Sequence, residues 1–233
     1  MTFTSLASSS KGNAYVVSDG ETTLLLECGL SFRELQKRLG YGVADITACL
    51  VSHEHQDHAK AAAQMLKAGV PVYMSEGTAA AHKDAMDAAH LIKAGDVLRF
   101  GHLTVVPFRT FHNTDEPLGF LIEDGRTKER LLWAVDTANL GVTADKLTYI
   151  AVECNYEERL LNRSDRIPSV LKDRIRHSHF EVSDVIRWLH KQDLSGVLTI
   201  WLLHLSAGNS RAEAWQVRFE REFPGIEIRV CPE

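Results

Sequence analysis

The sequence has few cysteines and no long apolar run. Its 233 residues include only four cysteines, which are scattered and form no CxxC pair. This spacing excludes a thiolate zinc knuckle and a dithiol redox motif, and it favours a reducing compartment. No stretch reaches the roughly 18 apolar residues that a membrane helix needs, and the first residues lack the basic start and apolar run of a secretory signal. We therefore expect a cytoplasmic protein with no membrane partner.

Positive charge is also scarce. Lys and Arg number 26 against 31 Asp and Glu, so the formal net charge is −5 with histidine neutral. A bulk basic surface that would hold duplex nucleic acid is therefore absent, although the composition leaves room for a local basic patch. Hydrophobic residues make up 45% of the chain, which is enough for a sizeable core in one large domain or two small ones.

Short apolar runs alternate with helical patterns along the chain, without repeats or low-complexity tracts. Turn signals and β-branched residues predict strands, and capped or alanine-rich segments predict helices. The expected strands are 15–17, 23–26, 46–51, 70–74, 103–108, 119–122, 131–135, 149–152, 197–203 and 226–230, and the expected helices are 32–39, 59–68, 77–89, 182–191 and 212–223. The polar stretch 8–13 is expected to be a loop. This alternation predicts a layered α/β domain.

Histidine is the compositional oddity, with 11 residues, and three of them fall within one short segment. That segment is His53-Glu54-His55-Gln56-Asp57-His58, directly after the strand predicted over 46–51. His53 and His55 are two apart, so in an extended stretch they point the same way and can share one ion. Asp57 and His58 begin the next helix and face a different point. Imidazole and carboxylate suit zinc, manganese or iron, so the segment predicts a site for two neighbouring ions.

Three further side chains of ligand type follow other predicted strands. They are His112, Asp136 and His204. A single His or Asp in such a place usually caps an element or lies in a loop. Because sites gather at strand ends, three of them together with the His53–His58 segment indicate further metal ligands.

These residues resemble the metallo-β-lactamase superfamily, whose hallmark is the HxHxDH segment seen at 53–58. The resemblance covers nearly the whole chain. Pieces that resemble the YycJ/WalJ-like subgroup and related phage-encoded hydrolases are residues 8–13, 29–31, 116–120, 136–137, 153–156, 178–179 and 204–206. The resemblance implies one domain over 1–233, with the four-layer αββα sandwich fold and a metal site along one edge.

The resemblance also implies a ligand set and its cofactors. His53, His55 and His112 would bind one ion, Asp57, His58 and His204 would bind the other, and Asp136 would bridge both. The expected cofactors are two divalent metal ions, zinc or manganese, with iron as an alternative. Glu27 stands where many relatives carry aspartate, and it is expected to support the site without binding metal.

The candidate catalytic residues are Asp57, His179 and Glu153. In the tRNase Z-like branch a Glu/His pair at similar places helps to protonate the leaving oxygen. His179 would therefore be the acid and Glu153 would orient it. The alternative for His179 is a residue that only begins a helix, whereas His177 is expected to be solvated.

Ser206 and Asn209 are candidate substrate-binding residues in the loop after His204. Their loop could offer backbone N–H groups to a phosphate at a helix start. Alternatively it only caps the helix at 212–223, with Ser210 as the N-cap. Four basic residues are further candidate phosphate contacts, none of them favoured: Lys11, Arg163, Arg166 and Arg176.

A two-ion site of this kind lowers the pKa of a shared water and stabilises developing negative charge, which predicts a metal-dependent hydrolase. The resemblance favours a phosphodiesterase or nuclease that acts on DNA or RNA ends or on small nucleotides, so nucleic acid or nucleotide is the expected partner. A cyclic-nucleotide phosphodiesterase, a glyoxalase II-like thioester hydrolase and a non-catalytic metal-binding module are the alternatives. The sequence leaves the oligomeric state open, with a homodimer as one alternative.

Overall fold

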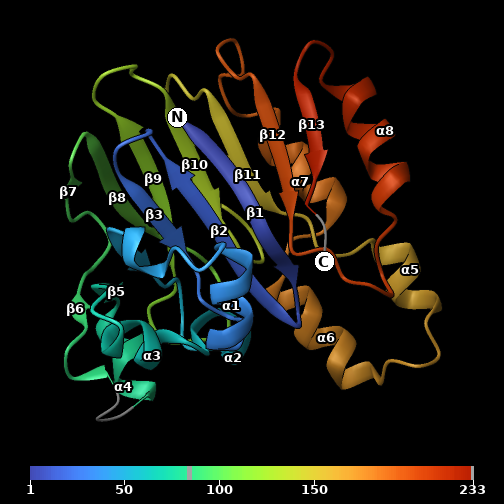
Figure 1. Cartoon of the computed structure of the whole chain (residues 1–233). Helices are drawn as coiled ribbons and strands as arrows, with labels where there is room; N and C mark the ends of the chain where they lie inside the picture. The colour runs from blue at the N-terminus through green and yellow to red at the C-terminus, as the bar shows by residue number, and fades with distance from the viewer. Residues whose placement is uncertain (83–85, 232–233) are drawn as a thin grey trace.

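Two facing β-sheets form the centre of the computed structural model, which describes residues 1–82 and 86–231 (Figure 1). The strands of the first sheet, as far as it is described, are β1 (Thr2–Ser9), β2 (Gly12–Ser18), β3 (Thr23–Leu26), β4 (Ala48–Leu50), β5 (Val72–Met74) and β6 (His90–Leu91), in that spatial order. Those of the second, from one edge to the other, are β13 (Glu227–Val230), β12 (Thr199–Leu203), β11 (Tyr149–Glu153), β10 (Arg130–Ala134), β9 (Leu118–Asp124), β8 (Leu103–Arg109) and β7 (Leu98–Phe100).

Each sheet is part antiparallel and part parallel. In the first sheet β3, β4, β5 and β6 pair in parallel, and in the second β10, β11, β12 and β13 do so. The carboxyl ends of parallel strands meet at one edge of a sheet, where polar side chains can gather without disturbing the core. The segments that follow β3, β4, β10, β11 and β12 carry the candidate site described below.

Helices flank both sheets. Beside the first sheet lie α1 (Phe32–Arg38), the 3₁₀ helix η1 (Val43–Asp45), α2 (Gln56–Ala59), α3 (Ala62–Lys67) and α4 (Glu76–Ala81); beside the second lie α5 (Glu158–Arg163), α6 (Ser169–Ser178), α7 (Val182–Leu189) and α8 (Ala212–Glu222) (Figure 1). None of the described helices is long and apolar enough to cross a membrane.

Three buried clusters hold these layers together. The cluster between the sheets includes Tyr15 and Leu50 from the first sheet and Trp133 from the second. A second cluster packs α1 and α3 under the first sheet, and a third packs α7 and α8 against the second sheet. Each sheet thus buries apolar side chains on both of its faces, against the other sheet on one side and against helices on the other. The layers are therefore helix, sheet, sheet and helix. The predicted αββα sandwich is confirmed.

The prediction of a loop over 8–13 is wrong in its bounds, because β1 runs to Ser9 and β2 begins at Gly12, which leaves only 10–11 for the turn. Ser8, Ser9 and Asn13 are buried although they are polar. Because these residues are polar, the sequence shows no apolar alternation that would indicate a strand here. Their burial is tolerated because their side chains form hydrogen bonds with other buried groups. The Ser8 hydroxyl, for example, accepts the backbone N–H of His204 over 2.8 Å.

Several helix predictions also need correction. The helix expected over 59–68 is two helices, α2 and α3, because the Ala61 N–H donates to the Cys28 carbonyl and interrupts the helical pattern. The helix expected over 77–89 ends at Ala81, and residues 83–85 of that prediction lie outside the described residues. The short edge strands β6 and β7 and the polar helices α5 and α6 were not expected, because they offer little hydrophobic periodicity.

Candidate metal centre

The seven predicted ligands come together between the two sheets' carboxyl edges. His53 and His55 lie in the loop after β4, and Asp57 and His58 lie on α2. The other three follow strands of the second sheet: His112 after β8, Asp136 after β10 and His204 after β12. Side chains far apart in sequence therefore meet at one point, as the strand-end argument predicts.

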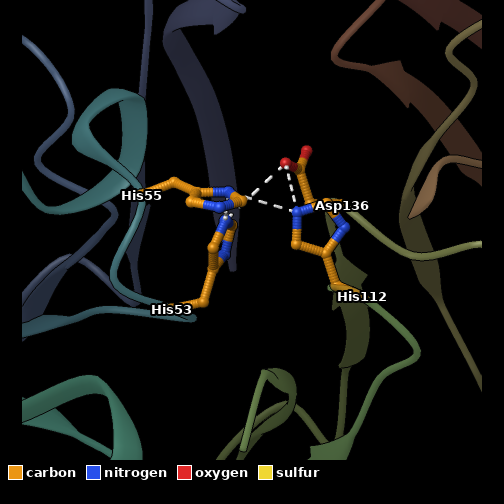
Figure 2. Close-up of side chains that lie close together, drawn as sticks. All are labelled: His53, His55, His112 and Asp136. Carbon is orange, nitrogen blue, oxygen red and sulfur yellow. Dashed lines mark hydrogen bonds and ion pairs between the residues drawn. The ribbon is translucent and has the colours of Figure 1, made fainter. Parts of the chain in front are cut away.

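Three imidazoles and one carboxylate form the first half of the centre (Figure 2). His55 Nδ1 lies 3.1 Å from His53 Nε2 and 3.2 Å from His112 Nε2. Asp136 Oδ2 lies 3.3 Å from that same nitrogen of His112. The Ser178 carbonyl accepts the His112 Nδ1–H over 2.7 Å, which leaves Nε2 with its lone pair. Lone pairs that converge in this way fit a divalent cation bound by N and O ligands.

The second half contains Asp57, His58 and His204. Asp57 Oδ2 lies 3.5 Å from His58 Nε2 and 3.6 Å from His204 Nε2. The buried Nε2 atom of His204 has no hydrogen-bond partner. Because a buried polar atom without a partner is costly, this orphaned nitrogen also fits a metal ligand.

Asp136 stands between the two halves. Its Oδ2 atom lies 3.4 Å from His58 Nε2 and 3.7 Å from His53 Nε2, in addition to its contact with His112. One carboxylate oxygen thus faces imidazoles of both halves. This geometry suits a ligand shared by two neighbouring ions.

A third set of groups that could hold an ion is Asp136, Glu153, His179 and His204. In this set the His179 Nδ1–H donates to Glu153 Oε1 over 2.6 Å, so these two side chains already satisfy each other. The other carboxylate oxygen, Oε2, accepts the backbone N–H groups of Thr137 at 2.8 Å and Phe180 at 3.3 Å. The fully buried Glu153 carboxylate is held in place by these hydrogen bonds. It in turn holds the partly exposed His179 ring in one orientation.

The backbone takes an unusual conformation where three of these side chains leave their strands. Glu27 and His204 directly follow a strand and Asp136 lies two residues after one, and their φ angles are 67°, 52° and 48° in that order. Non-glycine residues in this left-handed region cost on the order of 1–3 kcal/mol each. The fold tolerates this strain, and the turn directs each side chain toward the carboxyl edge of its sheet. Strain of this kind is concentrated at functional sites.

Buried polar side chains hold the ligands in place. Glu27 Oε1 accepts the Ser52 backbone N–H over 3.0 Å, and its Oε2 lies 3.4 Å from His58 Nδ1, the nitrogen that faces away from Asp136. Burial raises the pKa of the Glu27 carboxyl. Asn155 Nδ2 donates to the His204 carbonyl over 2.8 Å. These contacts suit the supporting role expected of Glu27, which stays a prediction, whereas the sequence gave no separate signal for Asn155.

The two halves differ in protonation. Burial lowers the pKa of His53, His55 and His112, so these imidazoles are neutral near pH 7 and keep lone pairs for a cation. Burial also acts to lower the pKa of His204, but the Asp136, Asp57 and Glu153 carboxylates outweigh it and raise that pKa to about 10. The carboxylates therefore attract positive charge here, and a metal ion can replace the protons.

An open cavity of about 320 Å³ lies over the centre. Besides six of the predicted ligand and acid side chains, it is lined by Ser10, Gln56 and Arg174. Arg174 was not among the expected phosphate contacts, because nothing in the sequence distinguishes it from the other basic residues of α6. Among the described residues its guanidinium has no hydrogen-bond or ion-pair partner, so it is available to an anion in the cavity.

Ser206 and Asn209 do not line this cavity. Asn209 is buried and its Nδ2 donates to Ser206 Oγ over 3.1 Å. Their role as substrate contacts stays a prediction. The alternative that Ser210 caps α8 is wrong, since its hydroxyl donates to the Ser206 carbonyl and Arg211 is the N-cap residue. His177 is exposed, as expected.

Gly29 is where the chain after β3 passes closest to α2. A Cβ at this residue would lie 1.6 Å from the Asp57 carbonyl oxygen, and the Cys28 N–H holds the contact by donating to the His58 carbonyl. Gly29→Ala should therefore lower the free energy of unfolding by about 3 kcal/mol, the upper end for overpacking. Urea denaturation measures this. Gly208→Ala is the control, because a Cβ there meets nothing within 4 Å; equal stability of both variants would contradict the close approach.

Comparison with known proteins agrees with this architecture. The model of the beta-lactamase superfamily domain matches residues 22–200. The exodeoxyribonuclease YycJ of Bacillus anthracis is 30% identical over 229 residues, which cover 91% of this chain and 84% of that protein. The exodeoxyribonuclease WalJ of Streptococcus pneumoniae is 25% identical over 249 residues, covering 97% and 89%.

A solved structure gives the same result for the fold. The metallo-beta-lactamase fold protein YhfI of Bacillus subtilis superposes with a TM-score of 0.73 at 17% sequence identity, covering 99% of this chain and 96% of that one. At this identity the likeness concerns the fold alone. The family model and the YycJ relative carry the assignment further: the chain belongs to the metallo-β-lactamase superfamily and is YycJ/WalJ-like.

Proposed function

We propose that this protein is a dinuclear metal-dependent phosphodiesterase that removes nucleotides from the ends of DNA. The observation that carries the proposal is the placement of Asp136, whose Oδ2 atom faces imidazoles of both halves of the centre at 3.3–3.7 Å. The exodeoxyribonuclease relatives support DNA as the polymer. Zinc or manganese suits the donor set, with iron as an alternative.

The seven ligands would hold two divalent cations, which supply positive charge for the phosphate and lower the pKa of the attacking water. Asp57, with a side chain 25% exposed, would accept a hydrogen bond from that water. Arg174 would pair with a phosphate oxygen across the cavity. His179 would protonate the leaving oxygen through Nε2, since its Nδ1–H is held by Glu153.

The His179–Glu153 pair favours a phosphodiester over a thioester substrate. An alkoxide leaving group is strongly basic and needs a proton, whereas a thiolate, with a thiol pKa of about 8.5, leaves readily without one. Burial opposes protonation of His179, but the Glu153 and Asp136 carboxylates outweigh it and raise the pKa of the ring. A positioned acid of this kind has a clear role in phosphodiester cleavage and little role in a glyoxalase II-like reaction.

A substrate panel tests this proposal. The metal-loaded protein should cleave bis-p-nitrophenyl phosphate and single-stranded DNA, and excess chelator should abolish both activities until zinc or manganese is restored. S-lactoylglutathione should be a poor substrate. Cleavage of the thioester alone would refute the proposal, and cleavage of cyclic mononucleotides but not of DNA would select the cyclic-nucleotide alternative. A protein that binds metal and cleaves nothing would be the binding module.

His58→Ala is the matched variant for this panel. His58 is buried with its Nε2 atom facing Asp57 and Asp136, and loss of a ligand should remove several kcal/mol of transition-state stabilisation, a fall of about 10³-fold in kcat/KM. Circular dichroism should show a folded variant. Full activity of this variant would count against the centre.

We also propose that residues 1–233 form one domain and that the protein works in the cytoplasm. In support of the second point, all four cysteines are free and buried, as suits a reducing compartment. Size-exclusion chromatography with light scattering would decide between a monomer and a homodimer.

A further inference from the structure

A second cavity, of about 560 Å³, adjoins the candidate metal centre. It is bounded by neighbours of the site residues along the same chain segments. Phe111 precedes His112, Ala138 follows Asp136 by two residues, and Arg176 follows Arg174 on α6. The two cavities are therefore lined by neighbouring residues of the same chain segments.

Phe111 offers an aromatic surface in this second cavity. Its side chain is 51% exposed, although it directly precedes a candidate metal ligand. The backbone is fixed on both sides, since the Phe111 N–H donates to Thr137 Oγ1 over 3.0 Å and its carbonyl accepts the Ala138 N–H over 2.8 Å. The ring edge lies beside Gly141, whose missing side chain keeps that space open. A half-exposed ring on a backbone held in this way is well suited to stack on a nucleobase.

The lining of this cavity also carries positive charge, although the chain as a whole is acidic. Arg176, Arg187 and Lys191 line the cavity, against one carboxylate, Asp184. Arg176 pairs with Glu158 and Asp173, and Arg187 pairs with Asp184. In the described part of the chain the Lys191 ammonium has no partner. Lys191 is therefore the cation in this lining that is available to a phosphate.

We propose that this cavity binds the nucleotides of single-stranded DNA next to the scissile bond, with a base stacked on Phe111 and a phosphate paired with Lys191. The proposal rests on the proposed phosphodiesterase function and specifies its substrate. Charge complementarity, and the chain segments that this cavity shares with the metal centre, argue for one strand that reaches both. A duplex would need a broad basic surface, which the net charge of −5 does not supply. A mononucleotide would leave the second cavity empty.

Binding measurements without turnover test the proposal. The probe is a fluorescein-labelled 12-residue oligothymidylate with phosphorothioate linkages, titrated by anisotropy with the full-length manganese-loaded protein, with thymidine monophosphate as competitor. The variants are Phe111→Leu and Lys191→Gln. Tyr41→Leu, at a residue 76% exposed, and Lys67→Gln, on α3, are the matched controls outside the cavity.

We expect the oligonucleotide to bind at least about tenfold more tightly than the monophosphate, and Phe111→Leu to weaken that binding by about tenfold. Lys191→Gln should also weaken it and should lower the slope of log Kd against log salt by about 0.7, the value for one lost phosphate contact on a single strand. The controls should bind as the wild type does.

Two results would overturn the proposal. One is an unchanged oligonucleotide Kd in both Phe111→Leu and Lys191→Gln, and the other is equal affinity of the wild type for the oligonucleotide and the monophosphate. Failure of the proposed phosphodiesterase function would look different. In that case the metal-loaded wild type would not cleave bis-p-nitrophenyl phosphate, whatever the binding measurements gave.

Discussion

Asp136→Asn should reduce the bound metal from two ions per chain to one or fewer and lower kcat/KM by about 10³-fold or more. Asp136 Oδ2 faces His112, His58 and His53, so its charge acts on both halves of the centre. Two bound ions would contribute several kcal/mol of transition-state stabilisation, and each 1.36 kcal/mol is a factor of ten in rate. The carboxamide keeps the shape of the side chain but loses its charge, so the fold should persist.

The measurement for Asp136→Asn combines elemental analysis of the dialysed protein with steady-state kinetics on bis-p-nitrophenyl phosphate. Asp124→Asn is the control, because Asp124 is also a buried aspartate but lies outside the centre. Its carboxylate accepts the backbone N–H of Arg126. It should keep both ions. Two ions and wild-type kinetics in Asp136→Asn would show that this carboxylate is not a shared ligand.

His179→Ala should slow DNA cleavage by about 10³-fold, within the 10²–10⁴ range for general acids, yet slow bis-p-nitrophenyl phosphate cleavage by less than about tenfold. The reason is the leaving group. A nitrophenolate is weakly basic and leaves without a proton, whereas the deoxyribose oxygen needs one. His102→Ala, at a half-exposed histidine beside Glu21, is the control and should not affect either substrate.

Glu153→Gln should act in the same direction through the position of His179. The amide can no longer hold the Nδ1–H by a charged contact, so DNA cleavage should fall while the nitrophenyl substrate is cleaved almost normally. Glu153 and His179 also belong to the third set of groups that could hold an ion. The metal content of each variant therefore distinguishes an acid-positioning role from a role as metal ligand. Loss of an ion in either variant, or equal losses on both substrates, would contradict the acid role.

The fold and the convergence of the seven candidate ligands were largely predictable, for a specific physical reason. Strands such as β4, β10 and β12 are fully or mostly buried, so their apolar runs are visible in the sequence, and the polar residues that follow them stand out. The close spacing of His53, His55 and His58 adds a signal that loops rarely give by chance. The apolar runs and the ligand-type side chains that follow them therefore both indicated a site at the carboxyl edge of the sheets.

Other features could not be predicted because they depend on contacts between distant segments. The end of β1 and the start of β2 look like a polar loop in the sequence, since Ser8 and Asn13 are polar groups that only the folded chain satisfies. Arg174 is one of many surface arginines in the sequence, and only the packing of α6 brings it to the cavity. The positive φ of Asp136 has no signature in the sequence either, because it is imposed by the surroundings.

The central claim is that seven side chains bind two neighbouring cations. Anomalous X-ray diffraction from crystals of the manganese- or zinc-loaded protein, collected on both sides of the metal absorption edge, measures it directly. We predict two anomalous peaks, one among His53, His55 and His112 and the other among Asp57, His58 and His204, with Asp136 between them. A single peak, or peaks away from these side chains, would contradict the account.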